Sequence, residues 1–273
     1  TFVKQVGGAE LNVAVGVALL GLRTGVISKL PSHDMGSFMK GKIRSYGVSD
    51  DFFMYDDSPS ARVGIHYYEN GAYPRKPKVI YDRANSSFYS LKIDEIPEKA
   101  YTASRCFHTS GITLALSPKV RETTIEMIKR FKAAGTLVSF DVNFRGNLWT
   151  GEEAKECIEQ ILPYVDIFFC SEDTARLTFK KTGTAREMMK SFTEEYPISI
   201  VASTQRIVHS PKSHTFGSII YDARKDIYYE EEPYRDIDVV DRIGSGDAYI
   251  SGALYGLLTS DFDCEKAVRY GNA

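Results

Sequence analysis

Asp241-Arg-Ile-Gly-Ser-Gly-Asp247 is the stretch that decides the fold of this chain. Val239 and Val240 precede it, and the small residues within 248–258 predict a helix that packs closely on a neighbour. A glycine-rich turn at a helix start leaves backbone N–H groups unpaired and directed at one point. With the positive end of the helix dipole, such groups hold an anion, typically a phosphate.

Asp247 places a carboxylate directly beside this predicted anion site. A carboxylate there has a clear use if it accepts a proton while the site receives negative charge. The simpler alternative is an Asp that only interacts with the helix dipole, after glycines that only form a turn. The stretch is neither a Walker A motif, since no Gly-Lys-Ser/Thr follows, nor Gly-x-Gly-x-x-Gly, since residue 249 is Tyr.

The whole string resembles the Asp-x-x-Gly-x-Gly-Asp signature of the ribokinase-like (phosphofructokinase-B) carbohydrate kinases. The resemblance implies an α/β fold: a three-layer α/β/α domain with a mostly parallel sheet, plus a small β-sheet lid. It implies that the amides of Gly244, Ser245 and Gly246 stabilise the transferring phosphate, and that Asp247 deprotonates the sugar hydroxyl. ATP would be the phosphate donor and Mg²⁺ would bridge its phosphates. A monovalent cation is left open.

The composition is that of an ordinary globular protein: 273 residues, 43% hydrophobic and 26% charged, enough for one large α/β domain with a small addition. A net charge of −2 gives no indication of a nucleic-acid or membrane partner. We find no apolar run of roughly 18 residues and no signal peptide, and four cysteines without a Cys-x-x-Cys pair, so a cytoplasmic protein with reduced thiols is expected. Family members are expected to extend beyond both ends of this chain.

Gly7-Gly8, followed by Asn12, opens an apolar helical segment and resembles the sugar-binding motif near the N-terminus of that family. Glycine backbone can approach a ligand closely, and an Asn side chain both donates and accepts hydrogen bonds. The alternative is a turn followed by an ordinary polar residue.

Residues 52–83 are rich in aromatic and β-forming residues, and Asn70-Gly71 is a hairpin signal. Strands are predicted at 62–68 and 78–81, joined in one small sheet by a strand at 1–6. Residues 1–6 and 52–83 would be the lid over the sugar, and residues 7–51 and 84–273 the catalytic domain. A small sheet with exposed edges and aromatics is marginal alone, so a homodimer through the lid is expected, with a larger oligomer left open.

The segment from Arg75 to Ser86 resembles one in 2-keto-3-deoxygluconate kinases. There, a Tyr-x-Arg pair, here Tyr81 and Arg83, grips the open-chain sugar acid, and a planar guanidinium suits a carboxylate. The alternative is a solvated Arg on an edge strand. One position departs from the family pattern, because His66 stands where family members have an aromatic residue.

From residue 104 onward, strands and helices alternate, which predicts parallel βαβ units with ligands at the carboxyl ends of the strands. Ser117 and Pro118 predict the start of a helix, and His108 is interpreted as a core histidine. Asp141, Asn143 and Arg145 follow a buried strand and resemble the Asp-x-Asn-x-Arg-x-x-Leu-Trp string of the same kinases. The resemblance implies that Asn143 and Arg145 contact the substrate and that Arg145 reaches the phosphate; the alternative is a polar loop.

The segment expected to bind the nucleotide and magnesium departs most from the family pattern. The family usually has Asn-x-x-Glu, tied to magnesium, where this chain has Ser171 and Thr174. Glu172 and Asp173 are candidates to reach the metal through water. Ser171, Ser203, Thr204 and Asn272 are the remaining candidates for the nucleotide.

We expect ATP-dependent phosphorylation of the primary hydroxyl of 2-keto-3-deoxygluconate, giving 2-keto-3-deoxy-6-phosphogluconate. Another ribokinase-like sugar kinase, such as a fructokinase, and a weakly active sugar-acid-binding homologue remain open. A dinucleotide-dependent oxidoreductase is disfavoured, because Gly7-Gly8 lacks the required glycine spacing.

Overall fold

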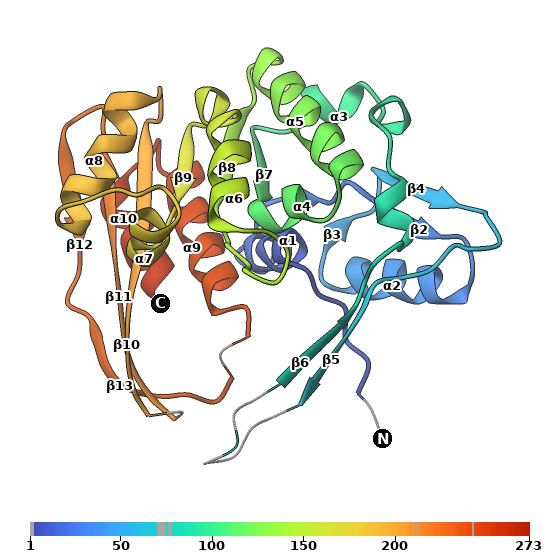
Figure 1. The fold of residues 1–273 in the computed structure, drawn as a ribbon, viewed down its shortest axis with the longest axis horizontal. Coiled ribbons are helices and arrows are strands. Elements are labelled where there is room, and N and C mark those ends of the chain that lie inside the picture. Colours follow the sequence, from blue (N-terminus) through green and yellow to red (C-terminus); the bar gives the residue numbers. More distant parts are fainter. Residues whose placement is uncertain (1–2, 70–74, 76–77, 211, 242) are drawn as a thin grey trace.

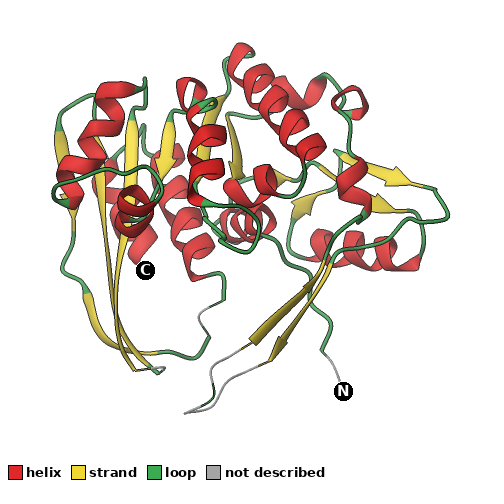
Figure 2. Ribbon diagram, viewed as in Figure 1, coloured by secondary structure: helices red, strands yellow, loops and turns green. Residues whose placement is uncertain are grey.

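A seven-stranded sheet runs through the centre of the protein, with helices on both faces (Figures 1 and 2). The computed structural model describes residues 3–69, 75, 78–210, 212–241 and 243–273. The strand order is β12-β11-β10-β9-β8-β7, and β13 pairs with β11. The strands β7 to β10 are parallel, while β11, β12 and β13 extend the sheet by antiparallel pairing. The bounds are β7 Cys106–Ser110, β8 Leu137–Asp141, β9 Ile167–Phe169, β10 Ile200–Ser210, β11 Ser213–Asp222, β12 Ile227–Glu230 and β13 Tyr234–Asp238.

Two short parallel pairs lie beside this sheet, with α2 Asp34–Ser45 between their strands in the sequence. The first joins β1 Thr24–Gly25 to β3 Val48–Ser49, and the second joins β2 Ser28–Pro31 to β4 Phe53–Asp56. The strands β1 and β2 are close in the sequence but pair with different partners.

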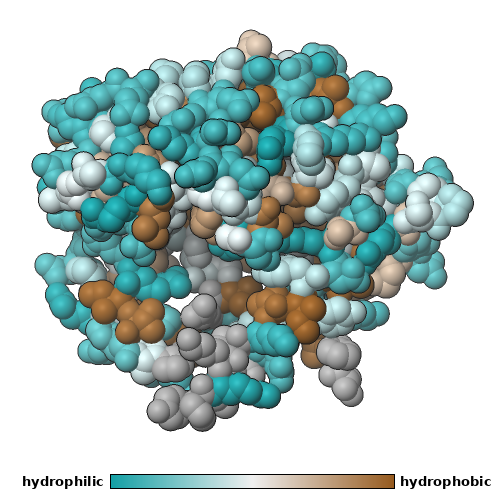
Figure 3. All heavy atoms as spheres, viewed as in Figure 1, coloured by the Kyte–Doolittle hydropathy of each residue, from teal (hydrophilic) through white to brown (hydrophobic). Residues whose placement is uncertain are grey.

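A separate antiparallel hairpin, β5 Ile65–Glu69 and β6 Lys78–Asp82, projects from the body (Figure 1). Both strands agree with the predicted flanks; the predicted Asn70-Gly71 turn lies outside the described residues. The strand predicted at 1–6 is wrong for residues 3–6, which lie outside any helix or strand. The hairpin is thus a two-stranded sheet, and β4 pairs with the body. Ile65, Val79 and Ile80 are exposed on it, and Figure 3 shows apolar side chains at the surface here.

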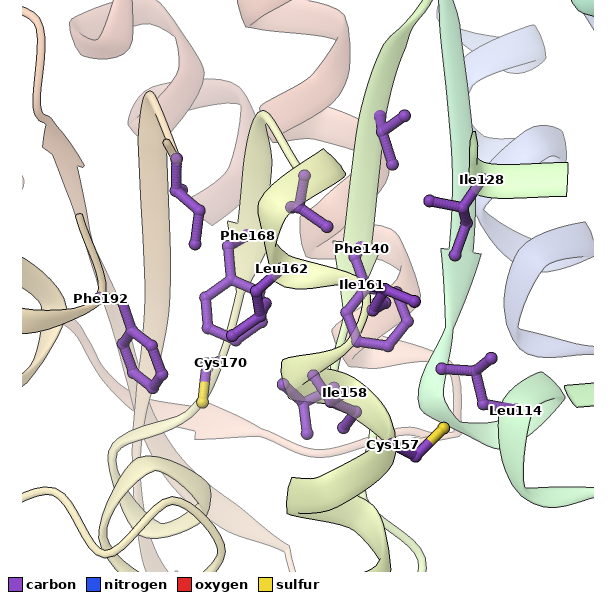
Figure 4. Close-up of a cluster of buried hydrophobic side chains, with 14 of the residues drawn as sticks. Leu114, Ile128, Phe140, Cys157, Ile158, Ile161, Leu162, Phe168, Cys170 and Phe192 are labelled. Carbon is purple, nitrogen blue, oxygen red and sulfur yellow. The ribbon is translucent and has the colours of Figure 1, made fainter. Parts of the chain in front are cut away.

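Two apolar layers of the core lie on opposite faces of the sheet, because successive strand residues point to opposite faces. A third buried cluster lies around α2 and the short strand pairs: Leu11, Leu30, Ile43, Val48 and Phe53. Phe168 of β9 packs in the layer with Phe140 and Phe192 (Figure 4), while its neighbours Ile167 and Phe169 pack in the other. The first layer is covered by α4 Gly111–Ala115, α5 Pro118–Ala133, α6 Gly151–Glu159, α7 Glu172–Leu177 and α8 Ala185–Glu195. The second is covered by α1 Ala9–Leu19, α9 Ser245–Thr259 and α10 Cys264–Asn272.

The remaining elements are short, and several local predictions can be checked directly. They are α3 Lys99–Thr102 and the 3-10 turns Ser87–Ser90, Ile93–Glu95 and Leu162–Tyr164. Ser117 Oγ accepts from the Val120 N–H with Pro118 at the first helical position, which confirms the predicted start of α5. The four cysteines are free thiols. Within the described ranges we find no helix that is both long and apolar enough to traverse a membrane.

Candidate active site

The helices α1 and α9 both begin without a side-chain cap. Their N-cap residues are Gly8 and Gly244, the latter in the left-handed region with φ 73°. In the described part of the chain, every other helix of eight or more residues has a capping side chain: His33, Ser117, Thr150, Thr184 and Asp263. Both uncapped starts line one cleft of about 1500 Å³. Their first-turn N–H groups are therefore available to a ligand in that cleft.

Small residues bring these two helices together. A Cβ on Gly16 of α1 would lie 2.3 Å from Ser251 Oγ of α9, so a larger residue does not fit. Ser251 Oγ donates to the Val13 carbonyl (3.2 Å) and to the Asp247 carbonyl (2.7 Å). As a result, the two N-termini open into the same cleft.

Asp247 is held at the point where the two helices meet. The Asn12 amide Nδ2 donates a hydrogen bond of 2.7 Å to Asp247 Oδ2. Burial raises the pKa of Asp247 above its usual range and the charge of Glu10 raises it further, while the Asn12 hydrogen bond and Arg145 act in the opposite direction. The carboxylate is thus oriented by an amide and made more basic than an exposed Asp.

A second carboxylate, Asp141, lies at the end of β8 in the same cleft. Burial raises the pKa of Asp141 to about 7, opposed by the Asn143 N–H, which donates to Asp141 Oδ1 at 3.1 Å; the charge of Asp247 raises this pKa further. Asn143 has φ 37°, an uncommon conformation that turns the chain away from the strand. Strained backbone of this kind gathers at functional sites.

The hairpin contributes one wall of the cleft through His66, Tyr81 and Arg83. The guanidinium of Arg83 lies over the ring of Tyr81, 4.3 Å from its centroid. His66 is the cross-strand partner of Tyr81, with ring centroids 6.2 Å apart. The structure therefore brings the predicted sugar-acid residues to the cleft that also holds Asp247, and His66 adds a polar ring beside them.

The predicted nucleotide residues do not all reach this cleft. On β10 the lining residues are Ala202, Thr204 and Arg206. Ser203 lies inside β10, where successive side chains point to opposite faces of the sheet. It is therefore buried on the face opposite to Ala202 and Thr204. Asn272 lies at the end of α10, where its Oδ1 accepts from Ser218 Oγ at 2.6 Å. Its Nδ2 is buried without a partner in the described part of the chain.

The residues at the expected magnesium position do not form a metal site of their own. Ser171 Oγ donates to Thr174 Oγ1 at 2.9 Å and caps α7, so both hydroxyls are engaged with each other. Glu172 forms an ion pair of 2.9 Å with Arg176, and Asp173 is exposed. Across the residues that the structure describes, no three His, Cys, Asp or Glu side chains are grouped to hold a metal.

Two charged residues of the cleft were missed from the sequence. Arg206 donates from Nη2 to Ser245 Oγ at 2.6 Å, at the start of α9. Its position two residues after Thr204 on an extended strand is a signal that could have placed it on the same face. Glu10 lies in the first turn of α1, between Gly8 and Asn12. Its position inside the expected sugar-binding motif is the sequence signal that could have indicated it.

Known proteins resemble this chain over nearly its whole length. The sequence model described as pfkB family carbohydrate kinase matches residues 1–273. A Haloferax volcanii protein named 2-dehydro-3-deoxygalactonokinase is 34% identical over 269 residues, covering 98% of this chain and 80% of the relative. A 5-dehydro-2-deoxygluconokinase from Listeria monocytogenes is 28% identical over 100% of this chain and 80% of its own length. The crystal structure of 2-dehydro-3-deoxygluconokinase from Thermotoga maritima is 29% identical and superimposes with a TM-score of 0.92, covering 100% of this chain and 84% of that one.

The raised pKa of Asp141 predicts a pH-dependent gain in stability when the carboxylate is removed. The folded-state pKa of about 7 exceeds the ordinary value of 3.8, so ionisation of Asp141 costs the folded state more as the pH rises between these values. Asp141→Asn should therefore raise Tm relative to wild type more at about pH 8 than at about pH 5. Thermal melts at both pH values test this, with the exposed Asp57→Asn as control. An equal Tm difference at the two pH values would contradict the inferred cost.

Proposed function

This chain belongs to the pfkB family of carbohydrate kinases, and from that premise we propose that it phosphorylates the primary hydroxyl of an open-chain sugar acid, with 2-keto-3-deoxygluconate as first candidate. The product would be 2-keto-3-deoxy-6-phosphogluconate and the donor ATP. The observation that carries the proposal is the Asn12–Asp247 hydrogen bond, between two uncapped helix starts in one cleft.

In the proposed reaction, Asp247 acts as the general base. The primary hydroxyl oxygen bonds to the γ-phosphorus of ATP while its proton passes to the Asp247 carboxylate. The bond between that phosphorus and the bridging oxygen breaks, and ADP leaves with the electron pair. N–H groups at the start of α9, from Gly244, Ser245 and Gly246, would receive the charge on the transferring phosphate. A raised pKa strengthens Asp247 as a proton acceptor near neutral pH.

The proposed substrate class rests on the arginines of the cleft. Arg83 and Arg145 both line it, and Arg83 is stacked on Tyr81, which fixes the plane of the guanidinium. A planar guanidinium binds a carboxylate through two parallel hydrogen bonds. Relatives named for 2-dehydro-3-deoxygalactonate and 5-dehydro-2-deoxygluconate support a deoxy keto sugar acid. We propose that Arg83 and Arg145 bind its carboxylate, and that Gly7, Gly8, Asn12 and Asn143 bind its hydroxyl and keto groups.

A weakly active sugar-acid-binding homologue is the second candidate, and one observation favours it. Ser171 and Thr174, where the family usually has Asn and Glu, hydrogen-bond to each other. ADP release with 2-keto-3-deoxygluconate, with and without magnesium, separates the two candidates. Binding of the acid by calorimetry without ADP release would select the second, whereas preferred turnover of fructose or ribose would select another sugar kinase.

We expect Asp247→Asn to remove most of the turnover. The amide keeps the size of the side chain but cannot accept the hydroxyl proton, and positioned bases contribute roughly 10²- to 10⁴-fold. The value of kcat should fall by about that factor with KM for ATP and for the acid little changed, because the interaction is lost in the transition state. Steady-state ADP release measures this, with Asp57→Asn as control. Turnover of Asp247→Asn at the wild-type rate would contradict the role of Asp247 as the base, and the glycine turn before it would then only begin a helix.

We expect Arg83→Lys to weaken binding of the acid specifically. Lysine keeps the charge but lacks the planar guanidinium that binds a carboxylate through two hydrogen bonds and stacks on Tyr81. The KM for 2-keto-3-deoxygluconate should therefore rise by about tenfold or more, with the KM for ATP unchanged. Arg62→Lys is the matched control, because Arg62 pairs with Asp82 outside the cleft. The 2-keto-3-deoxygalactonate epimer, fructose and ribose complete the panel. Wild-type preference for neutral ribose, or an unchanged KM in Arg83→Lys, would refute the carboxylate contact.

We also propose that the hairpin joins two subunits in a homodimer. Exposed apolar side chains on a projecting two-stranded sheet favour a partner surface. Light scattering at micromolar concentration should give the mass of a dimer, and Ile80→Lys should shift it toward the monomer. A wild-type protein that scatters as a monomer would remove this part of the proposal.

A further inference from the structure

Glu10 has a set of buried hydrogen-bond donors directed at one of its carboxylate oxygens. Its Oε1 accepts from the Ser110 N–H (3.0 Å), from Ser110 Oγ (2.8 Å), from Thr113 Oγ1 (2.6 Å) and, more weakly, from Thr109 Oγ1 (3.5 Å). All four donors are neutral, and their residues are buried. A half-buried carboxylate with this many donors is fixed in place, because leaving those donors unpaired would cost free energy.

These contacts connect the first turn of α1 to the junction between β7 and α4, where Ser110 is the N-cap of α4. On its other side, α1 is fastened to α9 by the Ser251–Val13 hydrogen bond and by the close approach at Gly16. Asn12 lies between these two attachments. Its amide therefore meets Asp247 from a helix that is held on both sides.

We propose that Glu10 is a positioning residue of the phosphoryl transfer, which holds the first turn of α1 so that Asn12 keeps Asp247 aligned with the start of α9. The inference rests on the proposed role of Asp247 as the base. A catalytic group displaced by about 1 Å can lose 10²-fold in rate, so the anchoring of α1 has a direct kinetic consequence. Gly7 and Gly8 precede the same turn, and their backbone would be placed by the same anchor.

The charge of Glu10 should affect the pH dependence of kcat, which a purely structural role would leave unchanged. The charged side chains that act on Asp247 are Glu10 on α1, Asp141 on β8, Arg145 after β8 and, through Ser245, Arg206 on β10. His108 on β7 lies close enough to Glu10 to be affected by its charge. His108 stays neutral near pH 7 because burial lowers its pKa to about 4. Glu10 raises the pKa of both Asp247 and Asp141. Removing its charge should therefore move the acid limb of the kcat profile to lower pH.

The experiment compares Glu10→Gln and Glu10→Ala with wild type, Asp247→Asn and a matched control. Gln keeps an oxygen that can accept the same hydrogen bonds but has no charge, whereas Ala removes both. Glu187→Gln is the control: Glu187 is also a first-turn glutamate that accepts from backbone and hydroxyl groups, on α8 away from the cleft. The measurements are kcat and KM for ATP with 2-keto-3-deoxygluconate across pH, with thermal melts to verify folding.

We expect Glu10→Ala to lower kcat by about 10- to 100-fold with KM for ATP within about twofold of wild type. Glu10→Gln should keep most of kcat above neutral pH and shift the acid limb downward, while Glu187→Gln matches wild type in both respects. A folded Glu10→Ala with wild-type kcat, or an unmoved acid limb in Glu10→Gln, would overturn the inference. If Glu10→Ala does not fold, the Gln profile decides alone. If one of these Glu10 results is negative while Asp247→Asn is inactive, the role of Glu10 is refuted and the proposed function still stands. A fully active Asp247→Asn would refute the proposed function itself.

Discussion

The contact between α1 and α9 is the constraint on which the rest of the site depends. Gly16 of α1 leaves room for Ser251 of α9, whose hydroxyl bridges to the Val13 carbonyl. With the helices this close, Asn12 reaches Asp247 at 2.7 Å. The same approach brings two uncapped helix starts into one cleft, so the geometry of packing and the electrostatics of the site have a single origin.

The cleft combines groups of opposite electrostatic effect. Burial raises the pKa of Asp141 to about 7, with the charges of Asp247 and Glu10 adding to the rise, and Glu10 also raises the pKa of Asp247. Their negative charge disfavours an anionic ligand beside them, whereas the helix starts and the arginines favour one. We infer that the phosphate of the donor and the carboxylate of the proposed substrate bind toward Arg206, Arg145 and Arg83. The uncharged hydroxyl end of the substrate would then face the carboxylates.

The sequence predicted those parts of the structure that local chemistry determines. The glycine turn before Asp247, the Ser117 cap and the strands of the hairpin follow from residue types and their spacing. Positions that depend on tertiary pairing were less predictable. Residues 3–6 have β-forming character but form no strand. Ser203 lies inside β10, so the alternation of strand side chains points it away from the cleft. The role inferred for Glu10 depends on donors about a hundred residues away, which no local pattern reveals.

The most direct test of the account is a crystal structure of the complex with ADP, aluminium fluoride as a mimic of the transferring phosphate, and 2-keto-3-deoxygluconate. The proposed mechanism predicts the fluoride at the N–H groups that begin α9, with the primary hydroxyl of the acid within hydrogen-bonding distance of Asp247 and its carboxylate on Arg83. A fluoride bound elsewhere, or a substrate whose hydroxyl is directed away from Asp247, would contradict it.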